Sequence, residues 1–231
     1  MGEPRQRHRT SRGTAISLLA TIALLVPVVL AIPAFAVTPS VYPPDASPLG
    51  MTYSEWEGSY MSWMQEIPRG RNPFNHPDSP KNCELVDGMV FLGGAGANCD
   101  VPTGTPVAFN PAYGFWECST AEGLGETYRQ LRRCATGRFW RDVNPSSYQQ
   151  RVLIDGVELT ENRRWIFLTP GEMVDFPKNN IWHVAPGPSK SVTKGFFFIL
   201  EPLDAGLHTI RVRVRDVVLG KSLYVFKLRV S

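Results

Sequence analysis

Two segments near the C-terminus, 207–216 and 222–230, alternate between apolar and polar side chains. Successive side chains on a β-strand point to opposite faces, so a period of two indicates strands with one buried and one solvated face. The buried set of the first segment is Ile210, Val212 and Val214, and its outward set is Arg211, Arg213 and Arg215. We therefore predict that the two segments pair as a hairpin around "VVLGKS" and belong to a sheet with one exposed face.

The remainder of the chain also reads mainly as short strands and turns. Gly and Pro number 20 each among 231 residues, which favours many short strands over long helices. In "RVLIDGVEL" (151–159), Asp155-Gly156 separates two β-rich arms, a pattern typical of a tight hairpin. The segment "GFFFILEPL" (195–203) is too apolar to face water on either side and predicts a central strand. The sequence therefore predicts a mainly β fold, a β-sandwich of the Ig-like or jelly-roll-like kind, with two short helices and disulfide staples.

The first predicted helix carries a stripe of aromatic side chains. Thr52 and Glu55 fit the S/T-x-x-E pattern that caps helix N-termini, and Pro68 ends the segment. At about 100° per residue, one stripe contains several large side chains, namely Tyr53, Trp56, Tyr60, Trp63 and Ile67. We interpret the stripe as the buried face of a helix, because a platform of rings displayed to a ligand does not need helical register.

A second helix is predicted over 123–137, "GLGETYRQLRRCATG". Leu124, Tyr128 and Leu131 would share one face of this helix, and Gly137 would end it. We expect both helices to pack on a larger β-sheet body.

The N-terminal segment 1–36 has the pattern of a secretory signal peptide. A basic region is followed by an uncharged apolar run over 14–32 and by the A-x-A signal Ala34–Ala36. We predict cleavage before Val37 and a secreted, extracytoplasmic protein. Because the apolar run is long, an uncleaved single-pass membrane anchor is the alternative.

We expect two further parts of the chain after the signal peptide. Residues 37–51 are rich in proline and predict an extended linker. Residues 52–231 are predicted to form a single β-rich domain, with no internal repeat.

All four cysteines follow the signal peptide, at Cys83, Cys99, Cys118 and Cys134. We predict the local pairing Cys83–Cys99 and Cys118–Cys134, because each pair brackets a short segment that contains glycine. On the chain-entropy argument, each bridge would stabilise the fold by about 3 kcal/mol. A four-cysteine zinc site is the alternative, but no C-x-x-C occurs and an exported chain meets an oxidising environment.

Formal charge argues against a nucleic-acid partner. The chain has 24 Lys+Arg and 21 Asp+Glu, but the segment 1–36 contains four arginines and Glu3. Residues 37–231 therefore carry 20 charges of each sign with histidine neutral. A general electrostatic attraction to nucleic acid is absent.

Candidate catalytic residues are few. No G-x-S-x-G motif is present. His76, with Asp78 two positions on, lies in a predicted loop and is the candidate for a hydrolase site, although a turn stabilised by Asx-type bonds is the favoured account of the pair. His183 and His208 are interpreted as structural, and the three histidines lack metal-ligand spacing, so we expect no metal and no cofactor. Several acids lie in the loop-rich first half, but the sequence does not indicate which of them converge: Asp87, Asp100, Glu117 and Glu122.

The predicted terminal hairpin places basic side chains on one sheet face. The candidate binding residues are Arg211, Arg213, Arg215, Lys227 and Arg229. Such a face can bind an anionic polymer. The alternative is a solvated face on which the aliphatic stems of arginine cover the sheet.

Several motifs taken in order resemble a group of bacterial exported proteins of uncharacterised function. They are an early tryptophan helix ("YSEWEGSYMSWMQEIP"), a V-x-F-L-x-G strand ("VFLGG" preceded by Met89), a C-x-V-P-x-G turn ("CDVPTG") and a P-L-x-x-G-x-H-T-I hairpin ("PLDAGLHTI"). The resemblance covers roughly 53–214. It implies secretion and a β-rich fold, and it supplies no activity and no catalytic residue.

Taken together, the sequence predicts an exported, non-catalytic β-sandwich protein of the cell surface or medium. We expect it to bind envelope polysaccharide or another anionic polymer, and to meet a membrane only through an uncleaved leader. An extracellular hydrolase with its site in the 70–125 loops is the alternative.

Overall fold

The computed structural model describes residues 40–231 apart from positions 77, 95, 112–113, 144–147, 160–161 and 217–219. The predicted signal peptide lies outside the described residues. The described part is mainly β, with two α-helices, α1 (Tyr53–Glu66) and α2 (Tyr128–Asp142), and two disulfides. Within this part, no helix is both long enough and apolar enough to cross a membrane.

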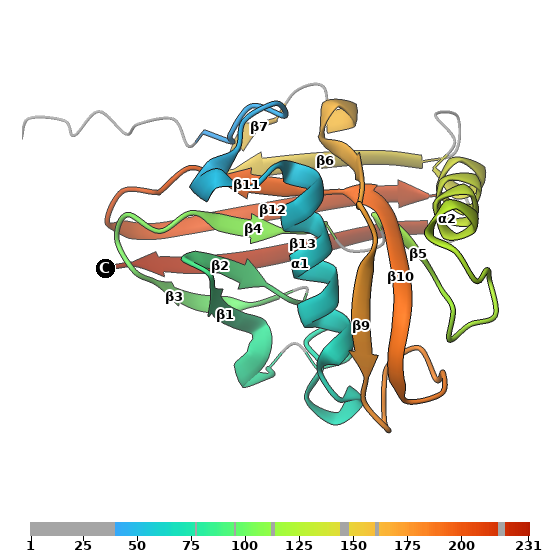
Figure 1. The fold of residues 1–231 in the computed structure, drawn as a ribbon. Helices are drawn as coiled ribbons and strands as arrows, with labels where there is room; N and C mark the ends of the chain where they lie inside the picture. The colour runs from blue at the N-terminus through green and yellow to red at the C-terminus, as the bar shows by residue number, and fades with distance from the viewer. Residues whose placement is uncertain are drawn as a thin grey trace, which may run out of the picture. The chain divides into compact units, whose positions relative to one another are not determined.

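The described strands form three sheets (Figure 1). Sheet A has the order β1-β2-β4-β11 and consists of β1 (Cys83–Val86), β2 (Met89–Leu92), β4 (Val107–Phe109) and β11 (Phe198–Leu200). Sheet B has the order β3-β13-β12-β6-β7 and consists of β3 (Asn98–Val101), β13 (Gly220–Val230), β12 (Gly206–Asp216), β6 (Tyr148–Ile154) and β7 (Val157–Glu158). In sheet C, β10 (Gly187–Phe196) pairs on one side with β5 (Phe115–Ser119) and on the other with β8 (Ile166–Leu168) and β9 (Glu172–Phe176). Short 3-10 turns occur at Pro48–Gly50, Arg69–Arg71, Pro80–Asn82 and Asn162–Trp165.

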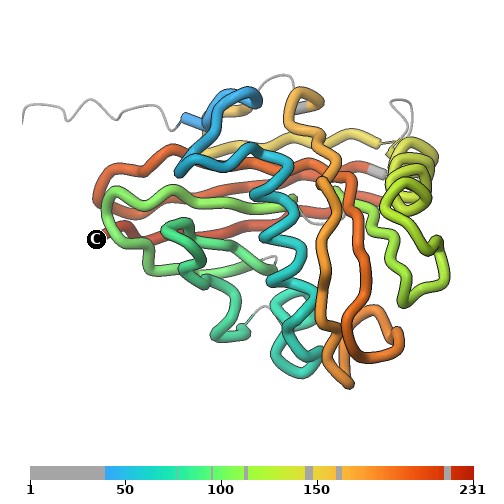
Figure 2. The backbone as a smooth tube through the Cα atoms, viewed as in Figure 1, coloured from blue at the N-terminus to red at the C-terminus, as the bar shows by residue number. Residues whose placement is uncertain are grey.

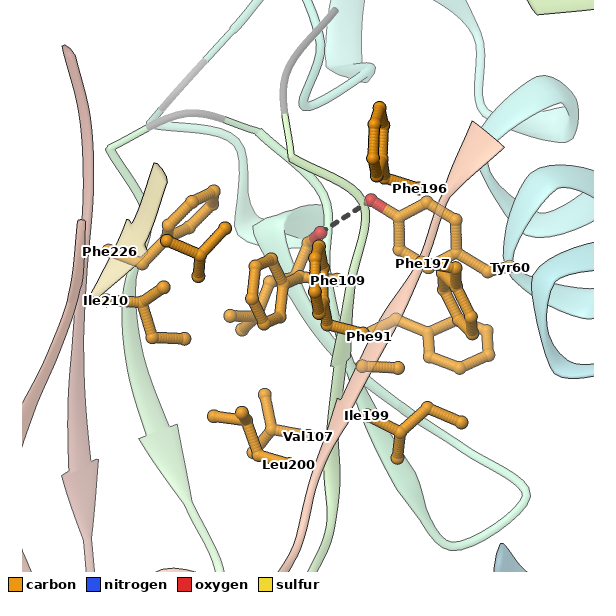
Figure 3. Packing of buried hydrophobic residues seen from close by; sticks show 14 of the residues in the cluster. Tyr60, Phe91, Val107, Phe109, Phe196, Phe197, Ile199, Leu200, Ile210 and Phe226 are labelled. Atoms are coloured by element: carbon orange, nitrogen blue, oxygen red, sulfur yellow. Dashed lines mark hydrogen bonds between the residues drawn. The ribbon is translucent and has the colours of Figure 1, made fainter. Parts of the chain in front are cut away.

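Sheet A lies between α1 and sheet B. Phe91 of β2 contacts the rings of Trp56 and Tyr60 on α1, at centroid distances of 6.1 and 5.3 Å. On the other side, Phe109 of β4 lies 6.0 Å from Phe226 of β13. Figure 3 shows Tyr60 on one side of this core and Phe226 on the other. The two face-to-face sheets confirm the predicted sandwich, and the third sheet and the parallel pairs β2–β4 and β3–β13 add to it.

Sheet C lies between the two helices. Its polar face is turned toward α1, where Gln65 donates to the hydroxyl of Ser191 at 3.3 Å. Its apolar face is turned toward α2, where Val192 packs with Leu131 and Ala135 in a second, smaller core.

One continuous segment connects sheet C to sheet A. The chain leaves β10 at Phe196 and enters β11 at Phe198, and the orange tube in Figure 2 turns between these two strands. The prediction of a central strand holds for Gly195 and Phe196, which end β10 in the middle of sheet C, but it is wrong for β11, the last strand of sheet A. It is nevertheless fully buried, since the segment before α1 covers its free edge: Val41 bridges Leu200, and the amide of Tyr42 donates to the carbonyl of Ile199 at 2.9 Å. The described part of the predicted linker is therefore packed on the β body.

The helix predictions succeed for α1 and fail in detail for α2. Helix α1 has the predicted capping box, and Tyr53, Trp56 and Tyr60 are each at most 2% exposed. Helix α2 instead begins after Thr127, which forms its own capping box with Gln130, and continues through Gly137 to Asp142. Leu124 lies before the helix and is exposed. The buried face of α2 consists of Leu131, Ala135 and Phe139.

Both disulfides have the predicted local pairing, each with a sequence separation of 16. Cys83–Cys99 joins β1 of sheet A to β3 of sheet B, and Cys118–Cys134 joins β5 of sheet C to α2. A protein with both bridges formed is suited to an oxidising environment.

The hairpin predicted at Asp155-Gly156 connects β6 to β7. Both residues have positive φ, 49° and 86°, as a type I′ turn requires. The same dipeptide at Asp87-Gly88 connects β1 to β2 with φ of 48° and 84°. The sequence analysis did not predict this second hairpin, although it carries the same signal. The predicted terminal hairpin is confirmed by the β12–β13 pairing, with its turn 217–219 outside the described residues.

Replacing Trp56 by Ala is expected to lower the free energy of unfolding by about 3–5 kcal/mol, as for other buried aromatic residues. The Trp56 ring is 1% exposed, and its indole N–H donates to the carbonyl of Pro48 at 2.8 Å. Trp140, which is 48% exposed on α2, provides the control, and Trp140→Ala should cost less than about 1 kcal/mol. Urea denaturation measures both, and equal losses would contradict the assignment of the α1 stripe to the core.

Candidate functional site

The outward face of sheet B gathers the basic side chains that the sequence singled out. Strands β12 and β13 alternate as predicted, with Ile210 and Val212 fully buried on the inner face. The structure adds Arg151 of β6 and Lys221 of β13 to the outward set, which we call the basic face. All seven basic side chains are exposed: Arg151, Arg211, Arg213, Arg215, Lys221, Lys227 and Arg229.

The strand register places two pairs of these cations directly opposite one another, Arg213 with Arg151 and Arg215 with Lys221. Arg211 is flanked by Val225 on β13 and by Leu153 on β6. Arg213 is opposite Leu223 on one side but opposite Arg151 on the other. Like charges directly opposite destabilise a sheet, so these two pairs carry a cost that Arg211, between two apolar residues, avoids.

Two carboxylates neutralise part of the basic face. Glu158 of β7 accepts from Arg151 Nε at 2.6 Å, and its pKa is lowered, first by that hydrogen bond and further by the charges of Arg151 and Arg213. Asp100 of β3 lies 3.8 Å from Arg229, with both side chains mostly exposed. Among the side chains that the structure describes, no carboxylate lies within ion-pair distance of the remaining five cations. The basic face therefore carries an excess of positive charge.

A hollow of about 350 Å³ lies at one end of the basic face, across β3, β13 and β12. Two rows of outward side chains border it, one row being Asn98, Lys227 and Thr209, and the other Asp100, Arg229 and Leu207. The row between them, Cys99, Leu228 and His208, points inward and leaves its backbone as the floor. The hollow is thus a groove that runs across the strands.

His208 beneath this groove is held as a structural residue. Its Nδ1 lies 2.6 Å from a carboxylate oxygen of Asp155, and its Nε2 lies 2.8 Å from the carbonyl of Asp204. Burial alone would lower the pKa of His208, but these hydrogen bonds outweigh it and the net pKa is raised. Since both ring nitrogens face acceptors, the protonated ring fits the site best. The second oxygen of Asp155 accepts from the amide of Thr209 at 2.7 Å, which ties the β6–β7 turn to β12.

The candidate hydrolase residues His76 and Asp78 are exposed, on the loop that precedes β1. The backbone amide of His76 donates to the carbonyl of Asn72 at 3.0 Å, and its carbonyl accepts from the amide of Ser79 at 2.9 Å. Within the described part of the chain, the imidazole of His76 has no carboxylate or hydroxyl partner. The structure does not bring this pair to a catalytic constellation, and no group of three or more described His, Cys, Asp or Glu residues is arranged to hold a metal ion.

The sequence analysis missed a layer of buried carboxyl groups between α1 and sheet C. Glu57 of α1 is fully buried and Glu117 of β5 is 5% exposed. In the described structure, both carboxyl oxygens of Glu57 and one of Glu117 lack a hydrogen-bond partner. Glu172 of β9 is partly buried and lies against Gly58, where a Cβ atom would meet its carboxylate oxygen at 2.1 Å. The sequence feature that points to this layer is the pair Glu57 and Gly58, which lies on another face of α1 than the aromatic stripe.

Burial raises the pKa of these three carboxyl groups, so they stay protonated at a higher pH than an exposed glutamate does. It raises the pKa of Glu117 to about 8, helped by the charge of Glu122 and opposed by the hydroxyl of Ser191. Burial likewise raises the pKa of Glu172 to about 7. The pKa of Glu57 is raised well above its ordinary value by burial and then by Glu172, and the charge of Lys194 only partly offsets this. Values near neutrality suit acid–base catalysis, but Glu57 and Glu117 are enclosed between a helix and a sheet.

Comparisons with known proteins leave the function open. No family model matches the chain, and no curated protein matches it. Among solved structures, the cysteine protease inhibitor EhICP2 from Entamoeba histolytica is 10% identical, with a TM-score of 0.22 over 59% of this chain and 87% of that one. Amebosin is 10% identical, with a TM-score of 0.22 over 59% and 90%. PbICP-C, solved in complex with falcipain-2, is 11% identical, with a TM-score of 0.23 over 62% and 98%. Scores this low carry no argument about function.

The buried carboxyl groups predict that stability falls as the pH rises from about 5 to 8. A carboxyl group whose pKa is raised on folding binds more protons in the folded state, so each pH unit in this window costs up to about 1.4 kcal/mol per group. Glu57→Gln should remove about that much of the pH dependence, because an amide does not ionise. Urea denaturation across this pH range measures the slope.

Glu126→Gln is the matched control, since Glu126 is exposed, and it should leave the pH dependence as it is in the unaltered protein. His208 acts in the same direction as the buried acids, because its raised pKa gives stability that is lost as the pH rises through it. A Glu57→Gln protein with the unaltered slope would show that Glu57 is not held protonated by the fold.

Proposed function

We propose that residues 37–231 form an exported, non-catalytic protein that binds an anionic polysaccharide of the cell envelope through the basic face. The single observation that supports this most is the concentration of seven exposed cations on one face of sheet B, with two carboxylates paired to them among the side chains that the structure describes. The signal-peptide pattern and the two disulfides support export.

The spacing of the basic face suits an extended polymer. Outward side chains on one strand repeat about every 7 Å, and neighbouring strands lie about 4.8 Å apart. Arg211, Arg213 and Arg215 form a row along β12, and Lys227 and Arg229 continue it on β13. An elongated polyanion can therefore contact several guanidinium groups at once, whereas a small anion meets one or two. Arginine also binds carboxylate and sulfate groups with two parallel hydrogen bonds.

Removing two cations that have no described carboxylate partner from the basic face is expected to weaken binding to alginate, a carboxylated polysaccharide. Arg211→Gln combined with Arg215→Gln should lower the affinity at low salt by at least about tenfold, since each contact of this kind contributes about 1 kcal/mol. Binding of the unaltered protein should also weaken as salt is added. Calorimetry or a surface-binding assay with purified protein measures both effects.

The control removes the same charge from another surface. Arg129 and Arg133 are exposed on α2, so Arg129→Gln combined with Arg133→Gln should leave alginate binding within about twofold, in keeping with a loss of only long-range attraction. Dextran, which is uncharged, should not bind. Equal losses in the two double variants would overturn the assignment to the basic face, and binding to anionic lipid vesicles without binding to alginate would overturn the polysaccharide assignment.

A further inference from the structure

We infer that the groove across β3, β13 and β12 is a subsite for one acidic sugar unit of the polymer, and that its uncharged side chains select sugars over other polyanions. This inference rests on the proposed function and names the chemistry that the basic face would recognise. It is carried by the composition and geometry of the groove walls, which differ from the rest of the face.

The groove follows from the strand register. Lys227 stands opposite both Asn98 and Thr209, and two residues further on Arg229 stands opposite both Asp100 and Leu207. The two rows are separated by about 7 Å, the repeat of side chains on one face of a strand. A ring that enters between them meets backbone below and a side chain of different chemistry on each side.

The two cations of the groove both come from the central strand, β13. Lys227 stands in one wall and Arg229 in the other, so an anionic substituent placed over β13 can contact both. The only carboxylate in the walls, Asp100, lies 3.8 Å from Arg229, and the two side chains are 79% and 70% exposed. An ion pair this exposed contributes little, so a bound anion can take the guanidinium without a large loss.

The remaining side chains of the two walls can bind groups that a sugar has and a simple polyanion lacks. Asp100 can only accept hydrogen bonds, and the amide of Asn98 and the hydroxyl of Thr209 can both donate and accept. Sugar hydroxyls supply donors to these acceptors, whereas a fully ionised phosphate polymer supplies none and is repelled by Asp100. Leu207, which is 79% exposed at the rim, offers an apolar surface to the C–H face of a ring.

The remainder of the basic face differs in this respect. Around Arg213, the neighbours across the strands are Leu223 and Arg151, and around Arg211 they are Val225 and Leu153. These positions give charge and apolar contact but no uncharged polar group. Arg215 has one uncharged polar neighbour across the strands, Gln149 of β6. The groove differs because it brings two such side chains, Asn98 and Thr209, to either side of Lys227.

The test removes the uncharged polar groups and leaves every charge in place. Asn98→Ala combined with Thr209→Val keeps the β-branched shape at 209 and should weaken alginate binding about tenfold, the loss expected for two hydrogen bonds. Binding of linear inorganic polyphosphate, measured under the same salt conditions, should not change. Gln149→Ala, an exposed uncharged residue on β6 of the same face, is the control and should affect neither polymer.

The other possible results distinguish failure of the subsite from failure of the proposed function. If alginate and polyphosphate both bind and the double variant changes neither, the subsite is wrong while the basic face stands. If the double variant weakens both polymers equally with an unchanged melting temperature, the groove does not distinguish sugars and the inference is overturned. If the unaltered protein binds neither polymer, the proposed function fails, and the subsite fails with it.

Discussion

The packing of α1 between sheets A and C is the interaction on which the rest of the structure depends. The Tyr60 ring lies 5.3 Å from Phe91 of sheet A and 5.4 Å from Phe197, the residue between β10 of sheet C and β11 of sheet A. Its hydroxyl donates to the carbonyl of Leu92 at 2.7 Å. One residue of α1 thereby fixes the distance of the helix from sheet A and from this connection. Because sheet B packs on the other side of sheet A, its uncovered outer face follows from this arrangement.

The features that could be predicted from the sequence are those set by neighbouring residues. The period of two in β12 and β13, the capping box at Thr52 and the turn at Asp155-Gly156 each depend on a few adjacent side chains. The same kind of local prediction is wrong for α2, because Leu124 lies outside its buried face and Gly137 does not end the helix. The Thr127–Gln130 capping box sets the start instead, and Gly137 is tolerated because packing of Leu131 and Phe139 outweighs the modest cost of a glycine inside a helix.

The buried carboxyl layer could not be predicted in the same way, because its members come from three distant elements. Glu57 and Glu172 approach each other only after α1 is laid on sheet C, and Glu117 lies on the same face of that sheet. Each is unremarkable in its own segment, and the sequence analysis considered Glu117 only as one of several acids in loops. This layer also alters the charge balance. With these three carboxyl groups protonated below neutral pH, residues 37–231 are no longer neutral but carry excess positive charge, which strengthens the attraction of an anionic ligand.

The outer face of sheet B is the part of the fold with the greatest freedom of composition. Its inner face must hold apolar residues such as Ile210 and Phe226 to fill the sandwich. Its outer face packs against no other described element and needs only side chains that are soluble in water. Uncharged residues, or acids and bases in equal number, would satisfy that demand without repulsion. The chain instead places five cations there beyond the reach of described carboxylates and separates several of them with apolar partners across the strands. Stability alone does not account for an excess of one sign, whereas an anionic ligand laid along the strands would relieve the repulsion when it binds.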